Sequence, residues 1–377
     1  MNLPNPGSSV HDIACSNCGR AYPAIGFPYR CAACGGLYEF AARSLAPFDP
    51  AKIDPGQPGI WRYRHTFGLP EDVEPVSLGE GRTPLIWAQA FGREVAFKCE
   101  FLNPTGSFKD RGSTLLATWL KARTVLETVE DSSGNAGASM AAYAARAGIR
   151  ARIFVPDSSA GPKRSQIEAY GAELVLVAGS RAETAEAVKI AAADGAAYAS
   201  HAFLPFNQPG YATAAFEIYD QLGGKQPGAV VLPVGQGGLL LGLFKGFQAL
   251  VSAGLTTGLP KLVGVQARRC APLWTLYSRG PTGLGFVAEN QTVAEGVRVR
   301  HPLRGDAVLE AVKASNGSVL AVEEDEILPG RDGLAALGFY VEPTSAIVWP
   351  ALPQTLGELP DPLVVVLTGS GFKFNPN

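Results

Sequence analysis

From about residue 76 onward, the chain alternates between short apolar runs and longer runs that are amphipathic or rich in alanine. Several of the apolar runs are β-branched and show no polar alternation, which is typical of strands buried on both faces. We therefore predict strands over residues 94–99, 124–129, 149–156, 172–177, 229–234, 262–266 and 363–367.

The runs between these strands have the pattern of helices. Pro162 and Gly171 bracket one of them as a start signal and a stop signal. The repeated β-α-β order predicts an α/β fold with parallel, helix-covered sheets, in which the chemistry lies in loops beyond the carboxyl ends of the strands. The predicted helices span residues 135–147, 162–170, 181–193, 211–222 and 238–253.

The first part of the chain differs from the rest. Residues 1–45 contain four clustered cysteines, and we expect them to form a small module of their own. Residues 46–75 are rich in proline, glycine and aspartate, which indicates a linker. Residues 76–377 then form the main region.

Composition limits the class of protein. The length of 377 residues favours two or three domains, and 46% hydrophobic with 18% charged residues is an ordinary balance for a globular enzyme. A net charge of -2 gives no reason to expect nucleic acid or an anionic membrane as a partner. No apolar run approaches the roughly 18 residues of a membrane span, and residues 1–11 lack the features of a signal peptide. We therefore expect a cytoplasmic protein.

Four of the six cysteines form two Cys-x-x-Cys pairs, whereas Cys99 and Cys270 stand alone. Each pair places two thiolates on one tight turn, and two such turns can hold a structural Zn²⁺ in a closed tetrahedron without a catalytic water. The alternatives are disulfides, free thiols or a redox pair, and a large chain without an export signal disfavours them. The predicted zinc ligands are Cys15, Cys18, Cys31 and Cys34.

The segment Asn103–Gly112 (NPTGSFKDRG) follows a predicted strand and enters a helix near Lys109. The helix dipole disfavours a cation at a helix start. It therefore lowers the pKa of an amine there, which suits a lysine that attacks an aldehyde. The alternative is a surface lysine in a turn capped by Ser107.

Two further loops each follow a strand and open a helix. Residues 131–139 (DSSGNAGAS) offer backbone N–H groups and hydroxyls to a carboxylate or phosphate, or else form an ordinary N-cap. Residues 233–242 (PVGQGGLLLG) place three glycines where the backbone can close around a phosphate, or else form a tight structural turn. This second loop is not the dinucleotide fingerprint, because position 240 is leucine, and it lacks the Gly-Lys-Ser/Thr of a P-loop.

Together these motifs resemble the fold-type-II pyridoxal-phosphate enzymes, and within that group the threonine synthase pattern. An N-terminal zinc-ribbon-like segment is also seen in that family. The motifs are Gly79–Leu85 (GEGRTPL), Ser107–Gly112 (SFKDRG), Ser132–Asn135 (SSGN), Ala294–Val297 (AEGV), Glu342–Ala346 (EPTSA) and Thr368–Lys373 (TGSGFK). The resemblance implies two parallel-sheet α/β domains beside the ribbon, an amino-acid substrate and a homodimer. Residues 76–377 would be the catalytic region, with residues 113–215 as a mobile substrate subdomain.

The same resemblance implies roles for individual residues. Lys109 would carry pyridoxal 5'-phosphate as a Schiff base and later move the Cα proton. Asn135 would hydrogen-bond the phenolic oxygen of the cofactor, and Thr368, or else Ser370, would contact the pyridine nitrogen. The cofactor phosphate would be held by Gly235, Gln236, Gly237, Gly238 and Leu239, and the substrate carboxylate by Ser132, Ser133, Gly134 and Ala136.

The resemblance to threonine synthases weakens where the phosphate of O-phosphohomoserine would bind. Asn207 stands where the family carries an arginine, so another cation must hold this phosphate. We favour Lys163 or Arg164, because these two residues open a predicted helix after a stretch rich in serine and glycine. Arg82 and Arg111 are the other candidates.

Three functions therefore compete. The first is threonine synthase, which eliminates phosphate from O-phosphohomoserine and adds water. The second is a threonine/serine dehydratase or a β-replacement enzyme such as cysteate synthase, because the Gly-Gln-Gly-Gly and Ser-Ser-Gly-Asn motifs are also similar to the dehydratases. The third is a catalytically silent protein that keeps the fold for binding, and an intact Lys109 with an intact glycine loop argues against it.

Overall fold

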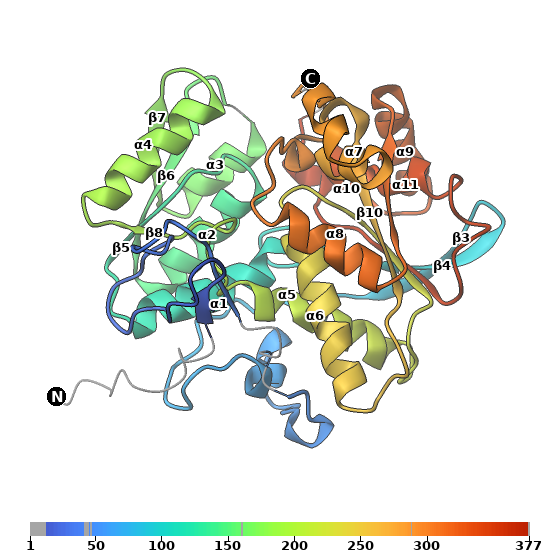
Figure 1. Cartoon of the computed structure of the whole chain (residues 1–377), viewed down its shortest axis with the longest axis horizontal. Coiled ribbons are helices and arrows are strands. Elements are labelled where there is room, and N and C mark those ends of the chain that lie inside the picture. Colours follow the sequence, from blue (N-terminus) through green and yellow to red (C-terminus); the bar gives the residue numbers. More distant parts are fainter. Residues whose placement is uncertain (1–12, 41–44, 46, 160, 288, 376–377) are drawn as a thin grey trace. The chain divides into compact units, whose positions relative to one another are not determined.

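The computed structural model of the protein describes residues 13–40, 45, 47–159, 161–287 and 289–375. These residues form two compact units (Figure 1). Unit 1 comprises the described residues of Met1–Glu80 and Lys109–Gly210, and unit 2 those of Gly81–Phe108 and Tyr211–Asn377. The chain therefore passes from one unit to the other three times, and one of these passages lies between Phe108 and Lys109.

Unit 1 contains a four-stranded parallel sheet in the order β7-β6-β5-β8. Ile153 and Val155 of its central strand β6 belong to one apolar cluster with Met140 of helix α2. The strands are β5 (Glu127–Glu130), β6 (Arg150–Pro156), β7 (Glu173–Val177) and β8 (Ala197–Tyr198). The helices are α1 (Lys109–Ala122), α2 (Asn135–Ala147), α3 (Pro162–Ala169) and α4 (Arg181–Ala193).

Local sequence signals set the ends of these helices. Pro162 occupies the first turn of α3, where its missing N–H costs nothing, and Gly171 follows shortly after the last turn. Helix α4 begins with a capping box, in which the side chains of Ser180 and Glu183 each accept a backbone N–H from the other end of the first turn. The helices predicted over residues 135–147, 162–170 and 181–193 are confirmed to within one residue.

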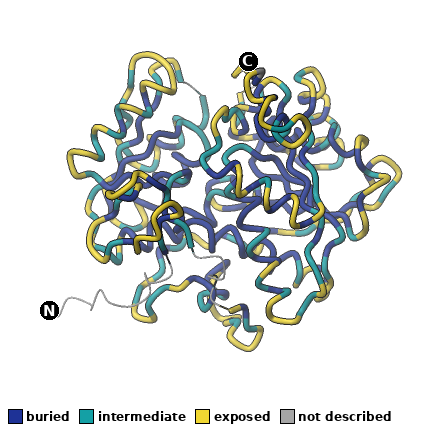
Figure 2. Tube along the Cα trace, viewed as in Figure 1, coloured by how far each residue is buried: buried dark blue, intermediate teal, exposed yellow. Residues whose placement is uncertain are grey.

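Unit 2 contains a six-stranded sheet in the order β11-β10-β9-β12-β4-β3. All of its neighbouring strands are parallel except β3 and β4, which are antiparallel. The strands are β3 (Leu85–Ala90), β4 (Arg93–Lys98), β9 (Ala229–Pro233), β10 (Lys261–Ala267), β11 (Ser318–Val322) and β12 (Leu363–Val366). The central strands β9 and β12 are buried along their whole length. Figure 2 shows buried chain in dark blue inside each unit and exposed chain in yellow mainly at the periphery.

The helices of unit 2 follow its strands along the chain. Helix α6, which the sequence predicted over residues 238–253, contains eight buried residues. The helices are α5 (Gln208–Gln221, beginning in the last residues of unit 1), α6 (Gly238–Ser252), α7 (Pro272–Arg279), α8 (Gly305–Ala314), α9 (Glu324–Ala336), α10 (Pro343–Ala346) and α11 (Val348–Ala351).

The predicted α/β fold with two largely parallel sheets is confirmed, and the differences have local causes. β5 begins at Glu127 rather than at Thr124, because Thr124 has a φ of 55° and Leu126 is exposed to 81%. The antiparallel edge strand β3 joins β4 through a turn that contains Phe91, and no strand was predicted there. None of the helices in the described ranges is long and apolar enough to cross a membrane.

The described part of the N-terminal segment is a small antiparallel hairpin of β1 (Ile13–Cys15) and β2 (Tyr38–Phe40). We call residues 13–40 the cysteine hairpin. Its buried rings Tyr22 and Phe27 lie 5.1 Å and 5.0 Å from the ring of Phe206, measured between centroids. The core of the hairpin is therefore continuous with the apolar core of unit 1. The boundaries predicted at residues 45 and 75, and the mobility of residues 113–215, stay predictions.

Candidate functional site

Three candidate segments of unit 2 leave neighbouring strands at one edge of its sheet. β9, β12 and β4 are adjacent and parallel, so their carboxyl ends meet at the same edge. The glycine loop follows β9, the Thr368–Lys373 motif follows β12, and the segment that leads to Phe108 follows β4. This is the edge at which ligands bind in open α/β sheets.

The segment before Lys109 is fixed to the Thr368–Lys373 motif by a series of hydrogen bonds within unit 2. The Phe108 N–H donates to the Thr368 carbonyl oxygen at 3.1 Å, and the Ser370 N–H donates to the Gly106 carbonyl oxygen at 2.9 Å. The Lys373 Nζ donates to the Thr105 carbonyl oxygen at 2.8 Å. Two motifs that are about 260 residues apart in sequence thus lie side by side, and Lys109 is the next residue after Phe108.

The hydroxyl of Thr368 is available for a ligand. The Thr368 N–H is bound to Ser345 Oγ at 2.8 Å, whereas Thr368 Oγ1 is buried and has no hydrogen-bond partner among the described residues. Buried hydroxyls are normally hydrogen-bonded, so an orphaned one indicates a missing partner. Ser370 Oγ already accepts the Phe372 N–H. This difference favours Thr368 over Ser370 as the contact to a cofactor ring nitrogen.

The glycine loop has the conformation needed to hold a phosphate through its backbone. Gly237 is the N-cap of the 15-residue helix α6, has a φ of 85° and is followed by N–H groups that receive no side-chain cap. A Cβ at Gly237 would lie 2.2 Å from Val308 Cγ2, so only glycine fits this position. The side chain of Gln236 is turned to the protein, since its Oε1 accepts the Leu303 N–H at 3.0 Å. Gly235, Gly238 and Leu239 complete the loop.

In unit 1, Lys109 is the first residue of α1, as the sequence predicted. Burial lowers the pKa of Lys109 to about 8, the negative charge of Glu130 opposes this shift, and the positive charge of Arg181 adds to it. The next residue, Asp110, is buried and accepts a hydrogen bond from Ser139 Oγ of α2 at 2.6 Å. This bond fixes the first turn of α1 against α2.

The loop Asp131–Gly134 connects β5 to α2 and presents an uncapped helix N-terminus. Gly134 is the N-cap of α2 and provides no side-chain cap, so the first N–H groups of the helix are available to an anion. Ser132 Oγ instead accepts the Gly134 N–H at 3.2 Å. A Cβ at Gly137 would lie 1.8 Å from the Ser132 carbonyl oxygen, so glycine is required for the loop to fold back on the helix. Ser133, Asn135 and Ala136 belong to the same turn.

Residues that the sequence analysis did not assign to the site lie beside this loop. Glu130, the last residue of β5, is 1% exposed, and its Oε1 is 2.8 Å from His201 Nδ1. Burial raises the pKa of Glu130 and lowers that of His201. No sequence pattern marked these residues, because β5 and β8 bring them together from 71 positions apart.

The candidate cations for a substrate phosphate have different surroundings. Arg111 is fully buried, and Gly210 packs against its backbone, which indicates a structural role. Arg164 donates to the Ser159 carbonyl oxygen at 3.1 Å and lies 3.7 Å from a carboxylate oxygen of Glu168, while Lys163 is partly exposed beside it.

Asn207 Nδ2 donates to the His201 carbonyl oxygen, so Asn207 supports the segment that carries His201. Arg82 is exposed in unit 2.

The Gly79–Leu85 motif has structural partners in each unit. Glu80 is buried in unit 1 and accepts the hydroxyl of Tyr143 at 2.7 Å. In unit 2, the buried Lys98 Nζ forms an ion pair with Glu217 at 2.7 Å and donates to the Thr83 carbonyl oxygen. Both ends of the motif therefore form contacts that stabilise the fold.

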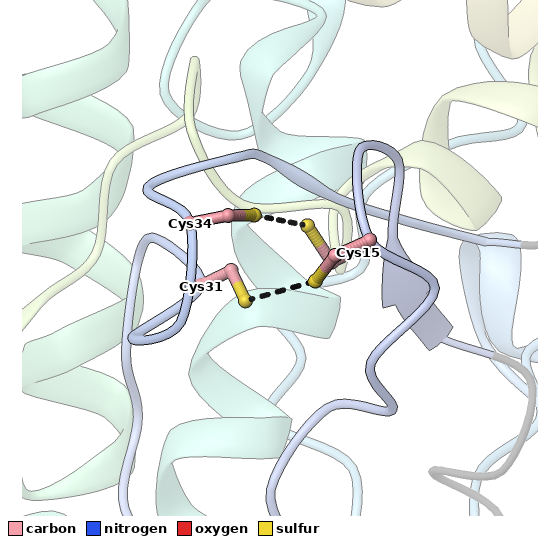
Figure 3. Close-up of side chains that lie close together, drawn as sticks. Cys15, Cys31 and Cys34 are labelled. Carbon is pink, nitrogen blue, oxygen red and sulfur yellow. Dashed lines mark hydrogen bonds between the residues drawn. The ribbon is translucent and has the colours of Figure 1, made fainter.

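The four cysteines of the hairpin are free thiols whose sulfur atoms all lie within 4.8 Å of one another (Figure 3). The Cys15 and Cys34 sulfurs are 3.4 Å apart, and those of Cys18 and Cys31 are 3.7 Å apart. A tetrahedral Zn²⁺ site with bonds of about 2.3 Å has sulfur atoms about 3.8 Å apart. Backbone N–H groups lower the pKa values of Cys15 and Cys31, whereas the neighbouring cysteines raise the pKa of Cys34, so the four thiols share their protons as a cluster. The geometry and donor set fit a closed zinc site.

Comparison with known proteins gives matches over most of the chain. The family described as "Pyridoxal-phosphate dependent enzyme" matches residues 76–369. A curated threonine synthase of Methanocaldococcus jannaschii is 32% identical over 373 residues, which are 95% of this chain and 92% of that protein. A curated threonine synthase of Mycobacterium tuberculosis (strain H37Rv) is 35% identical over 326 residues, covering 83% of this chain and 88% of that protein.

Solved structures agree with the fold. A threonine deaminase from T.th. aligns with a TM-score of 0.65 and 29% identity, over 78% of this chain and 94% of that one. A serine racemase from maize aligns with a TM-score of 0.66 over 77% of this chain and 89% of that one, and its 22% identity supports the fold alone.

Proposed function

The chain belongs to the family of pyridoxal-phosphate dependent enzymes, and we propose that it is a threonine synthase, which converts O-phosphohomoserine and water into threonine and phosphate. The observation that carries this proposal is the match to curated threonine synthases, which in one case covers 95% of the chain. The experiment that tests it is phosphate release from O-phosphohomoserine by the purified protein, with threonine identified as the second product.

Several separate segments of the chain carry residues with the chemistry needed to hold the cofactor. When bound, pyridoxal 5'-phosphate supplies an electron sink for the bonds at Cα of the substrate. We propose that Lys109 holds the cofactor covalently and moves the Cα proton, and that Asn135 binds its phenolic oxygen. The N–H groups of the glycine loop Gly235–Leu239 bind its phosphate, and the free hydroxyl of Thr368 binds its ring nitrogen.

A hydroxyl at the ring nitrogen has a chemical consequence. Thr368 cannot stabilise a positive charge on the ring as a carboxylate does, so the electron sink is moderate. Chemistry at such a site favours elimination and replacement at Cβ or Cγ over transamination. The substrate carboxylate binds at the uncapped start of α2, through Ser132, Ser133, Gly134 and Ala136.

The pKa of Lys109 gives a prediction for cofactor loading. With a pKa of about 8, half of the Lys109 amines are uncharged near pH 8, whereas only about 0.3% are uncharged at the usual pKa of lysine. Because only the uncharged amine attacks an aldehyde, we expect covalent attachment of pyridoxal phosphate to the cofactor-free protein to accelerate with pH and level off above a midpoint near 8. Stopped-flow absorbance measures this rate, and a midpoint near 10 contradicts the lowered pKa.

The identity of the substrate depends on a phosphate-binding cation. We propose that Lys163 or Arg164 provides it, because both lie at the start of α3. A charge-assisted contact contributes about 1.5–3 kcal/mol, so K163A/R164A is expected to raise KM for O-phosphohomoserine by roughly 10- to 150-fold with an unchanged cofactor spectrum. The readout is steady-state phosphate release.

Arg181 is the comparison variant for this experiment. Burial lowers the pKa of His201, and the positive charges of Lys109 and Arg181 lower it further. Arg181 therefore lies close enough to the site residues of unit 1 to act on them electrostatically. If R181A raises KM and K163A/R164A does not, Arg181 is the cation. If the wild type releases 2-oxo acid from threonine or serine but no phosphate from O-phosphohomoserine, the protein is instead a dehydratase. Turnover of O-phosphoserine by replacement at Cβ identifies a β-replacement enzyme.

We further propose that the cysteine hairpin binds one structural Zn²⁺ and that the protein acts as a cytoplasmic homodimer. The zinc proposal is supported by four thiols with tetrahedral spacing. The dimer is proposed from the family resemblance, and the mass of the holoenzyme in sedimentation equilibrium decides it.

A further inference from the structure

The segment from Tyr198 to Asn207 contacts the cysteine hairpin through aromatic rings. The ring of Tyr29 in the hairpin lies 5.0 Å from the ring of Tyr198 and 5.2 Å from that of Phe203. The guanidinium of Arg30 lies over the same Phe203 ring at 4.7 Å. Close aromatic pairs of this kind fix the orientation of the rings as well as burying apolar surface.

The same segment contacts the loop after β5 through two polar side-chain pairs. The Tyr198 hydroxyl donates to Asp131 Oδ1 at 2.7 Å, and the His201 imidazole is bound to Glu130 at 2.8 Å. Tyr198 is 2% exposed, and burial raises its pKa far above the usual value for tyrosine. The Tyr198 hydroxyl therefore remains protonated near neutral pH and can donate this hydrogen bond.

Asp131 is the first residue of the loop Asp131–Gly134, which we call the substrate loop. It is 8% exposed and is followed directly by Ser132, whose carbonyl oxygen packs against Gly137 at the start of α2. Removing the Tyr198 hydroxyl leaves a buried carboxylate without this donor, and such a group moves toward water. We expect this movement to displace the Ser132 N–H and the N-terminus of α2 that follows.

We propose that Tyr198 is a positioning residue for the substrate carboxylate, and that the ring of Tyr29 in the cysteine hairpin packs against the Tyr198 ring and holds it in place. The hairpin then contributes to substrate binding through the contacts Tyr29–Tyr198–Asp131, in addition to stabilising unit 1. This inference rests on the proposed function, because the loop holds a carboxylate only if an amino-acid substrate binds there.

The test separates binding from turnover in Tyr198→Phe. We expect Y198F to raise KM for O-phosphohomoserine about tenfold, with kcat within about twofold of the wild type and unchanged cofactor content. The dissociation constant for L-alanine, which has no leaving group and is measured from the visible absorption of the bound cofactor, rises by a similar factor. Y29A raises both constants about threefold, and the effects of Y29A and Y198F are not additive, because the two residues act through one contact.

Tyr277→Phe is the matched control. It removes a tyrosine hydroxyl that binds the Gly317 carbonyl oxygen in unit 2, and it leaves KM and the L-alanine constant unchanged. Y198F with wild-type values of both constants overturns the inference. So does a Y198F protein that loses cofactor and kcat together at unchanged KM, because that result indicates a structural role. A wild type that releases no phosphate while Y198F still weakens L-alanine overturns the proposed threonine synthase activity and supports the inference.

Discussion

Lys109→Ala is expected to abolish turnover, with kcat/KM at least about 10³-fold below the wild type, which corresponds to roughly 4 kcal/mol of transition-state stabilisation. The lysine is the first residue of α1, and burial lowers its pKa to about 8, so an uncharged amine is available near neutral pH. Its neighbour Phe108 is held to Thr368 by a backbone hydrogen bond. No other residue of this turn has an amine.

The spectroscopic part of the same experiment is more decisive than the rate. The wild type is expected to be yellow, and borohydride reduction followed by peptide mapping is expected to find the cofactor on Lys109. K109A then binds the cofactor only reversibly. Lys121→Ala, an exposed lysine in the last turn of the same helix, is the matched control and keeps colour and activity. Reduced cofactor found on another lysine, or on none, removes Lys109 from its proposed role.

Much of the fold could be predicted because local signals and tertiary structure agree. α2 and α4 have the bounds that the alanine-rich pattern predicted, and the buried strands β9 and β12 lie where apolar runs were found. The two-residue strand β8 is too short to leave a pattern, and its place beside β5 is a tertiary contact. The edge strand β3 is partly exposed and mixes apolar with polar residues, so it lacked the signature of a buried strand.

The candidate site also contains some residues that the sequence predicted and others that it did not. Loops that follow strands and open helices are visible in sequence, because glycine and serine at those positions have a local backbone reason. Glu130, Tyr198 and His201 were not assigned, because their importance depends on pairs formed across the sheet of unit 1. The preference for Thr368 over Ser370 also required the structure, since it rests on which hydroxyl already has a partner.

Loss of Cys31, one of the four proposed zinc ligands, is the second large prediction. Cys31→Ser is expected to reduce bound zinc from about one equivalent per chain to well under half. Structural zinc contributes about 10–16 kcal/mol in isolated zinc-finger peptides. Here the hairpin also packs on Phe206, which in turn contacts Trp119, so we expect the free energy of local unfolding to fall by at least about 4 kcal/mol rather than by the full amount.

Amide hydrogen exchange resolves this effect by region. In C31S, residues 13–40 are expected to exchange about 10³-fold faster, while strands β9 and β12 of unit 2 exchange as in the wild type. Cys270→Ala, which removes a buried thiol outside the hairpin, keeps the zinc and the protection of residues 13–40. Full protection of the hairpin in metal-free C31S contradicts a stabilising role for zinc and assigns the stability to the packing of Tyr22 and Phe27. Because Tyr29 contacts Tyr198, accelerated exchange that extends from the hairpin to Ser132–Ala136 is the further result expected if the hairpin also positions the substrate loop.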